Sequence, residues 1–329
     1  MIASQRARIA AAFATVYLMW GGTFLAIRYA VADIPPLMTM VLRYIAGATL
    51  LFAWIGWRGS FQRPSRDQWL TTGIAGVFLF LGCHGLLAWA EQRVGSGEAA
   101  LFMTAIPLWL IALESLLDRR LPSVRVVLAL VLGVAGVAVL TWGEGWSGGM
   151  SDRAILVVSA FFWAVGTVIV RRGGAPLPTA QSTAMQLGFG AIALLTASLA
   201  VGELKGWTPL DITPRAALSL AFLVVGGTVL GFGAYNWLLR VTSAAAASTY
   251  AFVNPVVALL LAWMVGDGAL SARTGVAAAL VVGAVVFSRE PPPSAREEVP
   301  EVLEGTTLER AIPRLRRSSR GGLAAALFR

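Results

Sequence analysis

Long apolar runs without a charged side chain alternate along this chain with short segments rich in Arg, Gly and Pro. Four intervals contain no Asp, Glu, Lys or Arg: Ile9 to Ile27, Gln68 to Ala90, Val126 to Gly143 and Ala216 to Leu239. A helix of about 20 apolar residues crosses the hydrocarbon core of a bilayer. The runs are continuous, without the period of two typical of barrel strands, so they predict membrane-spanning helices.

Gly, Pro and Arg, taken as loop signals, divide the chain into ten predicted spans. The spans cover 9–31, 36–57, 69–91, 97–117, 126–143, 154–172, 178–201, 216–239, 244–266 and 273–289. A cleavable secretory signal is an alternative for the first of them. That run is longer than a signal core, however, and a similar segment recurs in mid-chain. We therefore predict an all-α integral membrane protein with ten transmembrane helices.

Several short patterns occur twice in the chain. "WGGTFLAIR" at 20–28 returns as "WAVGTVIVR" at 163–171, and "AEQRVGSGEAAL" is paralleled by "WLLRVTSAAAAS". Pro107 in the fourth span likewise matches Pro255 in the ninth. If the repeated unit holds five helices, the odd number makes the second copy insert upside down. Such inverted repeats are typical of secondary transporters.

The repeat predicts the organisation of the whole chain. We expect two inverted five-helix repeats at 1–145 and 150–289, followed by a disordered, Arg-rich cytoplasmic tail at 290–329. Loop cations, counted on alternate sides of the ten spans, number eleven on the side of the N-terminus and six on the other. Lys and Arg accumulate in cytoplasmic loops, so both termini are expected in the cytoplasm.

Composition agrees with a membrane protein. Charged residues make up 13% of the chain, whereas soluble domains carry about 25%. The formal net charge is +9, but the Arg residues are scattered over short loops and the tail, so we expect no nucleic-acid partner. Cys83 is the only cysteine, which excludes an intramolecular disulfide and a CxxC metal or redox pair. We expect neither a metal nor a cofactor.

At this point the sequence resembles a known family. The resemblance rests on "WGGTFLAIRYAV", "PPLMTMVLRYIAG", "AEQRVGSGEAALFMTAIPLW", "SAFFWAVGTV" and "SAAAASTYAFVNPVVALLLAWMVGD", which occur in this order and in both halves. Together they are similar to permeases of the drug/metabolite transporter superfamily with two EamA domains, in the YedA-like branch. The resemblance implies a ten-helix inner-membrane exporter of small metabolites, amino acids or drugs, with both termini cytoplasmic.

A central cavity is the expected binding site. Trp20 and Trp163 fall near mid-bilayer on matching helices, where two indoles form an apolar wall with two hydrogen-bond donors, although packing against a neighbouring helix remains the alternative. Pro107 and Pro255 cannot donate to the preceding turn, which frees carbonyl groups for a ligand. The candidate cavity residues are Trp20, Arg43, His84, Met103, Pro107, Trp163, Tyr250, Asn254 and Pro255.

Ionisable side chains within a span are costly and usually have a partner. Arg43 is expected either to pair with Glu91 or to meet a substrate carboxylate. His84 titrates nearest to neutral pH, so it serves either proton coupling or packing. Glu114 either carries a proton or caps the Arg119 and Arg120 cluster. The candidates for proton coupling are His84, Glu91 and Glu114.

The chain lacks the motifs of ATPases and of common enzymes. It has no Walker loop and only one lysine, Lys205, so transport would draw on an ion gradient or on exchange. It has no HExxH and no GxSxG, and we expect no enzyme activity. We predict a secondary transporter that exports a small-molecule substrate through the lipid bilayer by alternating access, with proton coupling left open. The alternatives are an integral-membrane enzyme and a lipid-translocating or scaffold protein.

Overall fold

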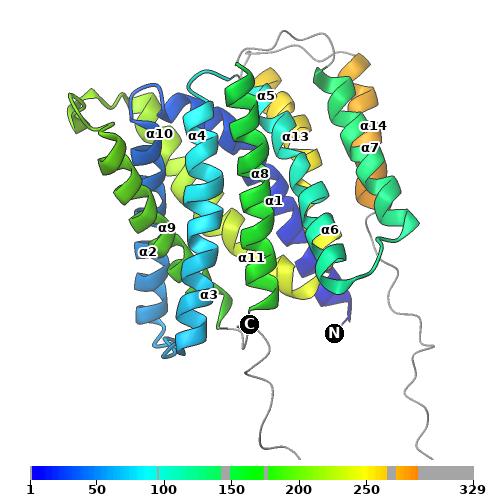
Figure 1. Ribbon diagram of the computed structural model, residues 1–329, viewed down its shortest axis with the longest axis horizontal. Coiled ribbons are helices and arrows are strands. Elements are labelled where there is room, and N and C mark those ends of the chain that lie inside the picture. The colour runs from blue at the N-terminus through cyan, green and yellow to red at the C-terminus, as the bar shows by residue number, and fades with distance from the viewer. Residues whose placement is uncertain (1, 95, 142–148, 174–176, 265–271, 288–329) are drawn as a thin grey trace, which may run out of the picture. The chain divides into compact units, whose positions relative to one another are not determined.

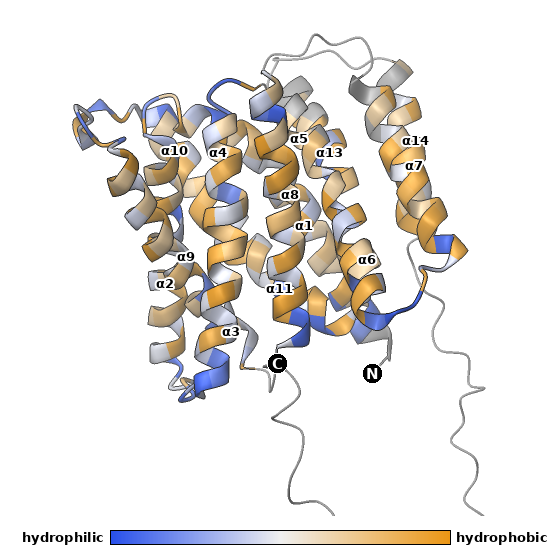
Figure 2. Ribbon diagram, in the orientation of Figure 1, coloured by the Kyte–Doolittle hydropathy of each residue, from blue (hydrophilic) through white to orange (hydrophobic). Residues whose placement is uncertain are grey.

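Helices fill the described part of the computed structural model, which comprises residues 2–94, 96–141, 149–173, 177–264 and 272–287 (Figure 1). These residues contain no strand. Hydrophilic residues gather towards the two ends of the helices, and hydrophobic residues cover the lengths between them (Figure 2). The predicted tail at 290–329 lies outside the described residues.

Each of the ten predicted ranges contains helix among its described residues. The elements are α1 (Ile2–Ala30), α2 (Pro36–Trp57), α3 (Arg66–Gly76), η1 (Val77–Gly85), α4 (Leu86–Ala90), α5 (Ser96–Met103), α6 (Ala105–Asp118), α7 (Val124–Thr141), α8 (Met150–Arg172), α9 (Thr179–Val201), η2 (Pro209–Asp211), α10 (Pro214–Phe222), η3 (Leu223–Phe232), α11 (Gly233–Val241), α12 (Ala244–Ala247), α13 (Tyr250–Met264) and α14 (Ala272–Phe287). Six helical stretches of the described chain are long and apolar enough to cross a membrane: 5–30, 36–57, 66–90, 150–172, 179–201 and 214–241.

Local sequence cues set several helix starts. Pro36 opens α2, where the missing N–H costs nothing because the first helical turn has no partner for it. Ser65 caps α3: its hydroxyl accepts the backbone N–H of Gln68 at 3.2 Å, and Gln68 Oε1 accepts the backbone N–H of Ser65 at 2.8 Å. Thr213 accepts the backbone N–H of Ala216 at 3.3 Å and so caps α10.

The fourth and ninth predicted spans are each broken into two helices. The fourth breaks at Thr104, between α5 and α6, and the ninth breaks at Ser248 and Thr249, between α12 and α13. Each break lies before the proline of its span. The missing N–H of Pro107 frees the carbonyl of Met103, next to the first break, whereas that of Pro255 frees the carbonyl of Ala251, inside α13.

Two π-helical segments occupy matching places. Residues 66–90 form one rod whose middle, η1, is π-helical, and residues 214–241 form another whose middle is η3. The widened turns lend carbonyl groups to neighbouring helices. Gly227 O accepts the indole N–H of Trp20 at 2.8 Å, and Cys83 O accepts the hydroxyl of Ser159 at 2.9 Å. Such segments are frequent at functional sites.

Helices α2 and α9 pack side by side and run in opposite directions. Glu203, just after α9, accepts the backbone N–H groups of Leu37 at 3.2 Å and of Met38 at 2.7 Å, at the start of α2. Gln181, near the start of α9, accepts the backbone N–H of Gln62 at 2.9 Å and donates to Gln62 O at 2.6 Å, just beyond the end of α2. The start of each helix thus meets the end of the other.

Several contacts that the first half makes with the second recur when the two halves are exchanged. The α1–α13 contact corresponds to α8–α6, the α1–η3 contact to α8–η1, and the α2–η3 contact to α9–η1. The α2–α9 and α7–α14 contacts each correspond to themselves. This part of the contact pattern is therefore kept when the two halves are exchanged.

The bundle has two distinct ends, which we name after the arginines of the repeated segment. At the Arg28 end, Arg93 pairs with Asp152 at 2.7 Å, and Thr213 donates to Asp33 through its hydroxyl and its backbone N–H. These hydrogen bonds lower the pKa of Asp33, so the carboxylate stays charged at neutral pH. At the Arg171 end, Arg172 pairs with Asp118 at 2.7 Å.

Candidate functional site

A small cavity lies between the helices in the half of the bundle nearer Arg28. Its volume is about 40 Å³, which is room for a few water molecules. Thr23 and Ile27 line it from α1, and Arg43 lines it from α2, seven residues after the start of that helix. At about 1.5 Å per residue, Arg43 lies roughly 10 Å below the Arg28 end.

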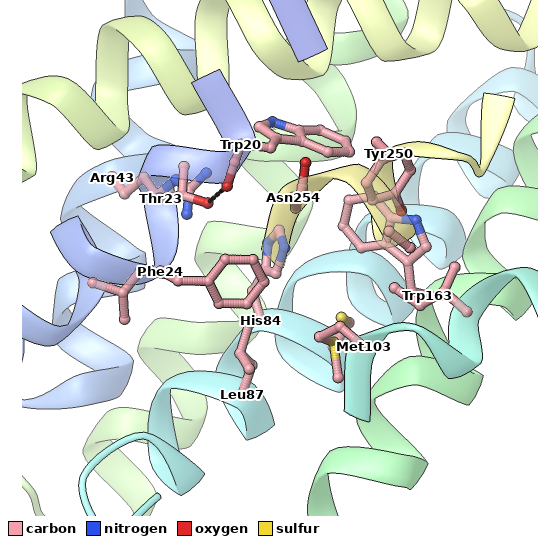
Figure 3. Close-up of a pocket in the computed structure, with 14 residues that line it drawn as sticks. Trp20, Thr23, Phe24, Arg43, His84, Leu87, Met103, Trp163, Tyr250 and Asn254 are labelled. Atoms are coloured by element: carbon pink, nitrogen blue, oxygen red, sulfur yellow. Dashed lines mark hydrogen bonds between the residues drawn. The ribbon is translucent and has the colours of Figure 1, made fainter. Parts of the chain in front are cut away.

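The rings of Trp20, Trp163 and Tyr250 gather on one side of the cavity (Figure 3). Trp20 and Trp163 meet edge to face with ring centroids 5.5 Å apart, and Trp20 meets Tyr250 in the same way at 4.6 Å. Tyr235 lies 5.1 Å from Trp20 and 5.6 Å from Trp163, between centroids. The two tryptophans of the repeated pattern are thus brought into direct contact, as the sequence predicts.

Both buried indole N–H groups have an acceptor, as burial requires. Trp20 donates to Gly227 O at 2.8 Å, and Trp163 donates to the hydroxyl of Tyr235 at 3.3 Å. Tyr235 also shares a 2.9 Å hydrogen bond with Thr167. The two halves therefore differ in detail: one indole is bound to a backbone carbonyl of a π-helical segment and the other to a phenol.

Arg43 is a buried cation in the cavity wall, with 3% of its surface exposed. Its Nε donates to Thr228 Oγ1 at 2.8 Å. Of the two expected roles of Arg43, the ion pair with Glu91 is not formed between these described residues, whereas the cavity-facing position is. The guanidinium turns from α2 towards η3, whereas Glu91 follows the end of α4.

Glu114 is not bound to Arg119 or Arg120, so that expectation is wrong. Its Oε1 accepts from Arg171 Nε at 2.9 Å, across from α8 to α6. Arg119 follows α6 with a left-handed backbone, φ 52°, which ends the helix. The neighbouring Asp118 pairs with Arg172. Acids of α6 thus bind arginines of α8 rather than arginines of their own loop.

His84 lies on η1 at the polar side of the cavity. Its Nδ1 shares a hydrogen bond with the hydroxyl of Tyr44, and its ring lies 4.9 Å from that of Trp163, between centroids. Tyr44 and Trp163 therefore hold the imidazole in the cavity wall. The ring is well packed, and one of its nitrogens stays near the cavity.

Seven of the nine predicted cavity residues line the cavity, and two do not. The seven are Trp20, Arg43, His84, Met103, Trp163, Tyr250 and Asn254. Pro107 and Pro255 are buried but are not part of the lining. Asn254 Oδ1 is buried without a hydrogen-bond partner among the described residues, which leaves an acceptor available to a ligand.

Residues on the same helix faces were missed. Thr23, Phe24 and Ile27 follow Trp20 at helical spacing, and Leu87 follows Cys83 in the same way. The spacing i, i+3, i+4 and i+7 marks one helix face. It would have extended the predicted site to all five of these lining residues.

Gly231 leaves room for the indole of Trp20, which predicts a specific steric effect. A Cβ at Gly231 would lie 2.5 Å from Trp20 Nε1, whereas a Cβ at Gly233 would meet nothing within 4 Å. We expect Gly231→Ala to destabilise the protein by about 1–3 kcal/mol, as overpacking does. Gly233→Ala is expected to be neutral or to stabilise by up to about 1 kcal/mol.

The measurement is thermal unfolding in detergent, followed with a dye that becomes fluorescent on reaction with Cys83. This sole cysteine is buried in the folded protein, so it reacts on unfolding. Equal midpoints for the two alanine variants would contradict the close approach of Gly231 to Trp20.

Comparisons with known proteins agree with this architecture. The inner membrane transporter YedA of Escherichia coli strain K12 is 31% identical over 273 residues, covering 83% of this chain and 87% of that protein. The transporter YoaV of Bacillus subtilis strain 168 is 24% identical over 253 residues, covering 76% of this chain and 86% of that protein. A solved crystal structure, 21% identical, aligns with a TM-score of 0.70 over 86% of this chain and 97% of that one, and so shares the fold.

The model of the EamA-like transporter family matches this chain twice, at residues 8–142 and 154–289. The two matches take in most of the chain. Together with the apolar helices, they show that this protein is a membrane transporter that belongs to the EamA-like transporter family.

Proposed function

We propose that this protein is a secondary transporter that exports small amphipathic metabolites, amino acids among them, across a bacterial inner membrane by alternating access. The observation that carries the proposal is the cavity where Trp20 and Trp163, from matching segments of the two halves, meet. Midplane sites between repeats are typical of secondary transporters. The name of YedA, an inner membrane transporter, supports the choice of membrane.

The two halves act as inverted five-helix repeats, with ten crossings in all. Three observations support this arrangement: the family model matches twice, α2 and its counterpart α9 run antiparallel, and several contacts between the halves recur when the halves are exchanged. Loop cations gather near the Arg171 end, which supports a cytoplasmic position for that end and for both termini. The cavity then lies in the outer half of the membrane.

The substrate carries a carboxylate and an apolar or aromatic body. Arg43 supports the carboxylate, because it is a buried cation of the lining without an acidic partner among the described residues. Trp20, Trp163 and Tyr250 supply a wall for the apolar part. At about 40 Å³ the cavity must widen to admit such a molecule, as expected of one state in a transport cycle.

Proton coupling, where present, runs through His84 and Glu91. His84 shares the cavity with Arg43, and Glu91 is a buried carboxylate at the end of the same rod. Glu114 is less suited to carry a proton, since Arg171 holds it in an ion pair. His84→Ala and Glu91→Gln are expected to flatten the pH response of transport.

Counterflow in proteoliposomes tests the proposal. Vesicles loaded with unlabelled amino acids are expected to accumulate the same labelled amino acid, at pH 6 and pH 8, in the presence of the protein but not in protein-free vesicles. Aromatic and aliphatic amino acids are compared with cationic amines of similar size. Exchange of the amines alone, or turnover of added compounds into new products, would overturn the assignment.

A further inference from the structure

Arg171 joins three elements at its end of the bundle. Its Nε donates to Glu114 Oε1 at 2.9 Å, which ties α8 to α6. Its Nη1 donates to Leu239 O at 3.0 Å and to Thr242 O at 3.3 Å, which ties α8 to the end of α11. We call this set of contacts the Arg171 latch. It holds α6, α8 and the end of α11 together at the Arg171 end.

Arg28, the counterpart of Arg171 in the repeated segment, is not engaged. It stands in the last turn of α1 as Arg171 stands in the last turn of α8. Its side chain is exposed, and it forms no hydrogen bond or ion pair with any described residue. The same residue type at the same place is therefore bound at one end of the bundle and free at the other.

Glu91 is a buried acid without a partner at the Arg28 end. Only 6% of its surface is exposed, and neither carboxylate oxygen has a hydrogen-bond partner within the described part of the chain. Arg28 and Arg43 are the cations near enough to act on it electrostatically. A buried carboxylate is normally paired, because leaving it alone costs several kcal/mol.

The repeat places Glu91 where a second latch would need an acceptor. In the paired segments "AEQRVGSGEAAL" and "WLLRVTSAAAAS", Glu91 corresponds to Leu238, the neighbour of Leu239 whose carbonyl binds Arg171. If Arg28 copied the contacts of Arg171, it would reach the end of the rod that carries Glu91. Arg28 and Glu91 are therefore the two partners of a contact that is not made in this state.

We propose that Arg28 and Glu91 form a second latch, which closes the Arg28 end in the opposite state of the transport cycle. This inference rests on the proposed alternating-access function. In the present state the Arg171 latch is closed and the Arg28 latch is open. When the halves exchange conformations, Arg171 releases Glu114 and Arg28 binds Glu91, so the central cavity is never open at both ends.

Weakening the closed latch shifts the population towards the opposite state, because a two-state equilibrium responds to any interaction made in one state only. Arg171→Gln removes the ion pair with Glu114, and it also removes the positive charge from the group that donates to the carbonyls of Leu239 and Thr242. Glu114→Gln removes the ion pair alone. Both are expected to increase the time that Arg28 and Glu91 spend together, by about tenfold for Arg171→Gln.

Cross-linking of the second latch provides the test. In a Cys83→Ala background, Arg28→Cys and Glu91→Cys are joined by a short bifunctional thiol reagent in native membranes, since a disulfide is shorter than an Arg–Glu contact. The rate of cross-linking is read from protection against a PEG-maleimide gel shift. We expect a rise of about tenfold with Arg171→Gln and a smaller rise with Glu114→Gln.

Arg172→Gln is the matched control. Arg172 is the next residue of α8 and also pairs with an acid of α6, Asp118. This pair is 40% and 53% exposed, and within the described residues Arg172 makes no hydrogen bond to the end of α11. Arg172→Gln is therefore expected to leave the cross-linking rate unchanged. Two results would overturn the proposed second latch. One is a cross-linking rate that neither Arg171→Gln nor Glu114→Gln changes, and the other is a rate that rises equally with Arg172→Gln. Counterflow by the wild-type protein tests the transport function separately. Failure of the proposed transport function can therefore be distinguished from failure of the proposed latch.

Discussion

Trp20→Ala is expected to lower the free energy of unfolding by about 3–5 kcal/mol, the usual cost of removing a large buried aromatic side chain. Trp20 is 6% exposed and its ring contacts those of Trp163, Phe232, Tyr235 and Tyr250. In a bilayer, packing rather than exclusion of water holds helices together. The loss of these ring contacts therefore lowers the free energy of unfolding directly. The unfolding midpoint, followed through Cys83, measures the effect.

Two further variants separate the causes. Trp57→Ala removes a tryptophan that is 83% exposed, and we expect it to change the midpoint little. Trp20→Phe keeps a ring but leaves Gly227 O without its donor, which costs about 1–3 kcal/mol. If Trp20→Ala were no more harmful than Trp57→Ala, the contact between the halves at Trp20 would not hold the bundle together.

Arg43→Met is expected to reduce counterflow of carboxylate substrates by about 30- to 160-fold. This follows from the loss of a charged hydrogen-bonding group worth about 2–3 kcal/mol, at 1.36 kcal/mol for each tenfold change. Arg43→Lys keeps the charge and is expected to retain much of the rate. The measurement is the initial rate of exchange at a fixed amount of folded protein in the vesicles.

Thr228→Val tests whether Arg43 acts on the substrate or only on the fold. This change removes the acceptor that holds Arg43 Nε at 2.8 Å but leaves the guanidinium charge in the cavity. We expect a loss of severalfold at most. A loss as large as that of Arg43→Met would show that the Arg43–Thr228 bond matters for structure and would remove Arg43 from substrate recognition.

Helix positions could be predicted from the sequence because charge is so costly in lipid. The charge-free runs and the Gly, Pro and Arg between them place helices within a few residues of those observed, and α2 at 36–57 agrees at both ends. The breaks at Thr104 and at Ser248 were not located. A proline disturbs the turn before it, and the residue at which the helix yields depends on neighbouring contacts.

Partners were harder to predict than positions. Counting residues gives the depth of a side chain in the membrane, but it does not give the rotation of one helix against another. Arg43 and Glu91 share the half of the bundle nearer Arg28, yet Arg43 turns to Thr228. Trp20 and Trp163 were paired correctly because the repeat relates their helices, and such a relation fixes both depth and direction.

The two π-helical segments bind their neighbours through main-chain oxygens: Gly227 O accepts from Trp20 and Cys83 O accepts from Ser159. A carbonyl is present whatever residue occupies the site. Homologous chains can therefore exchange the side chain at 83, which lines the chamber, for another of similar size without giving up the bond from Ser159. Position 227 does not share this freedom, because a Cβ there would lie 2.8 Å from Thr23 Cγ2 and 2.9 Å from Arg43 Nη2.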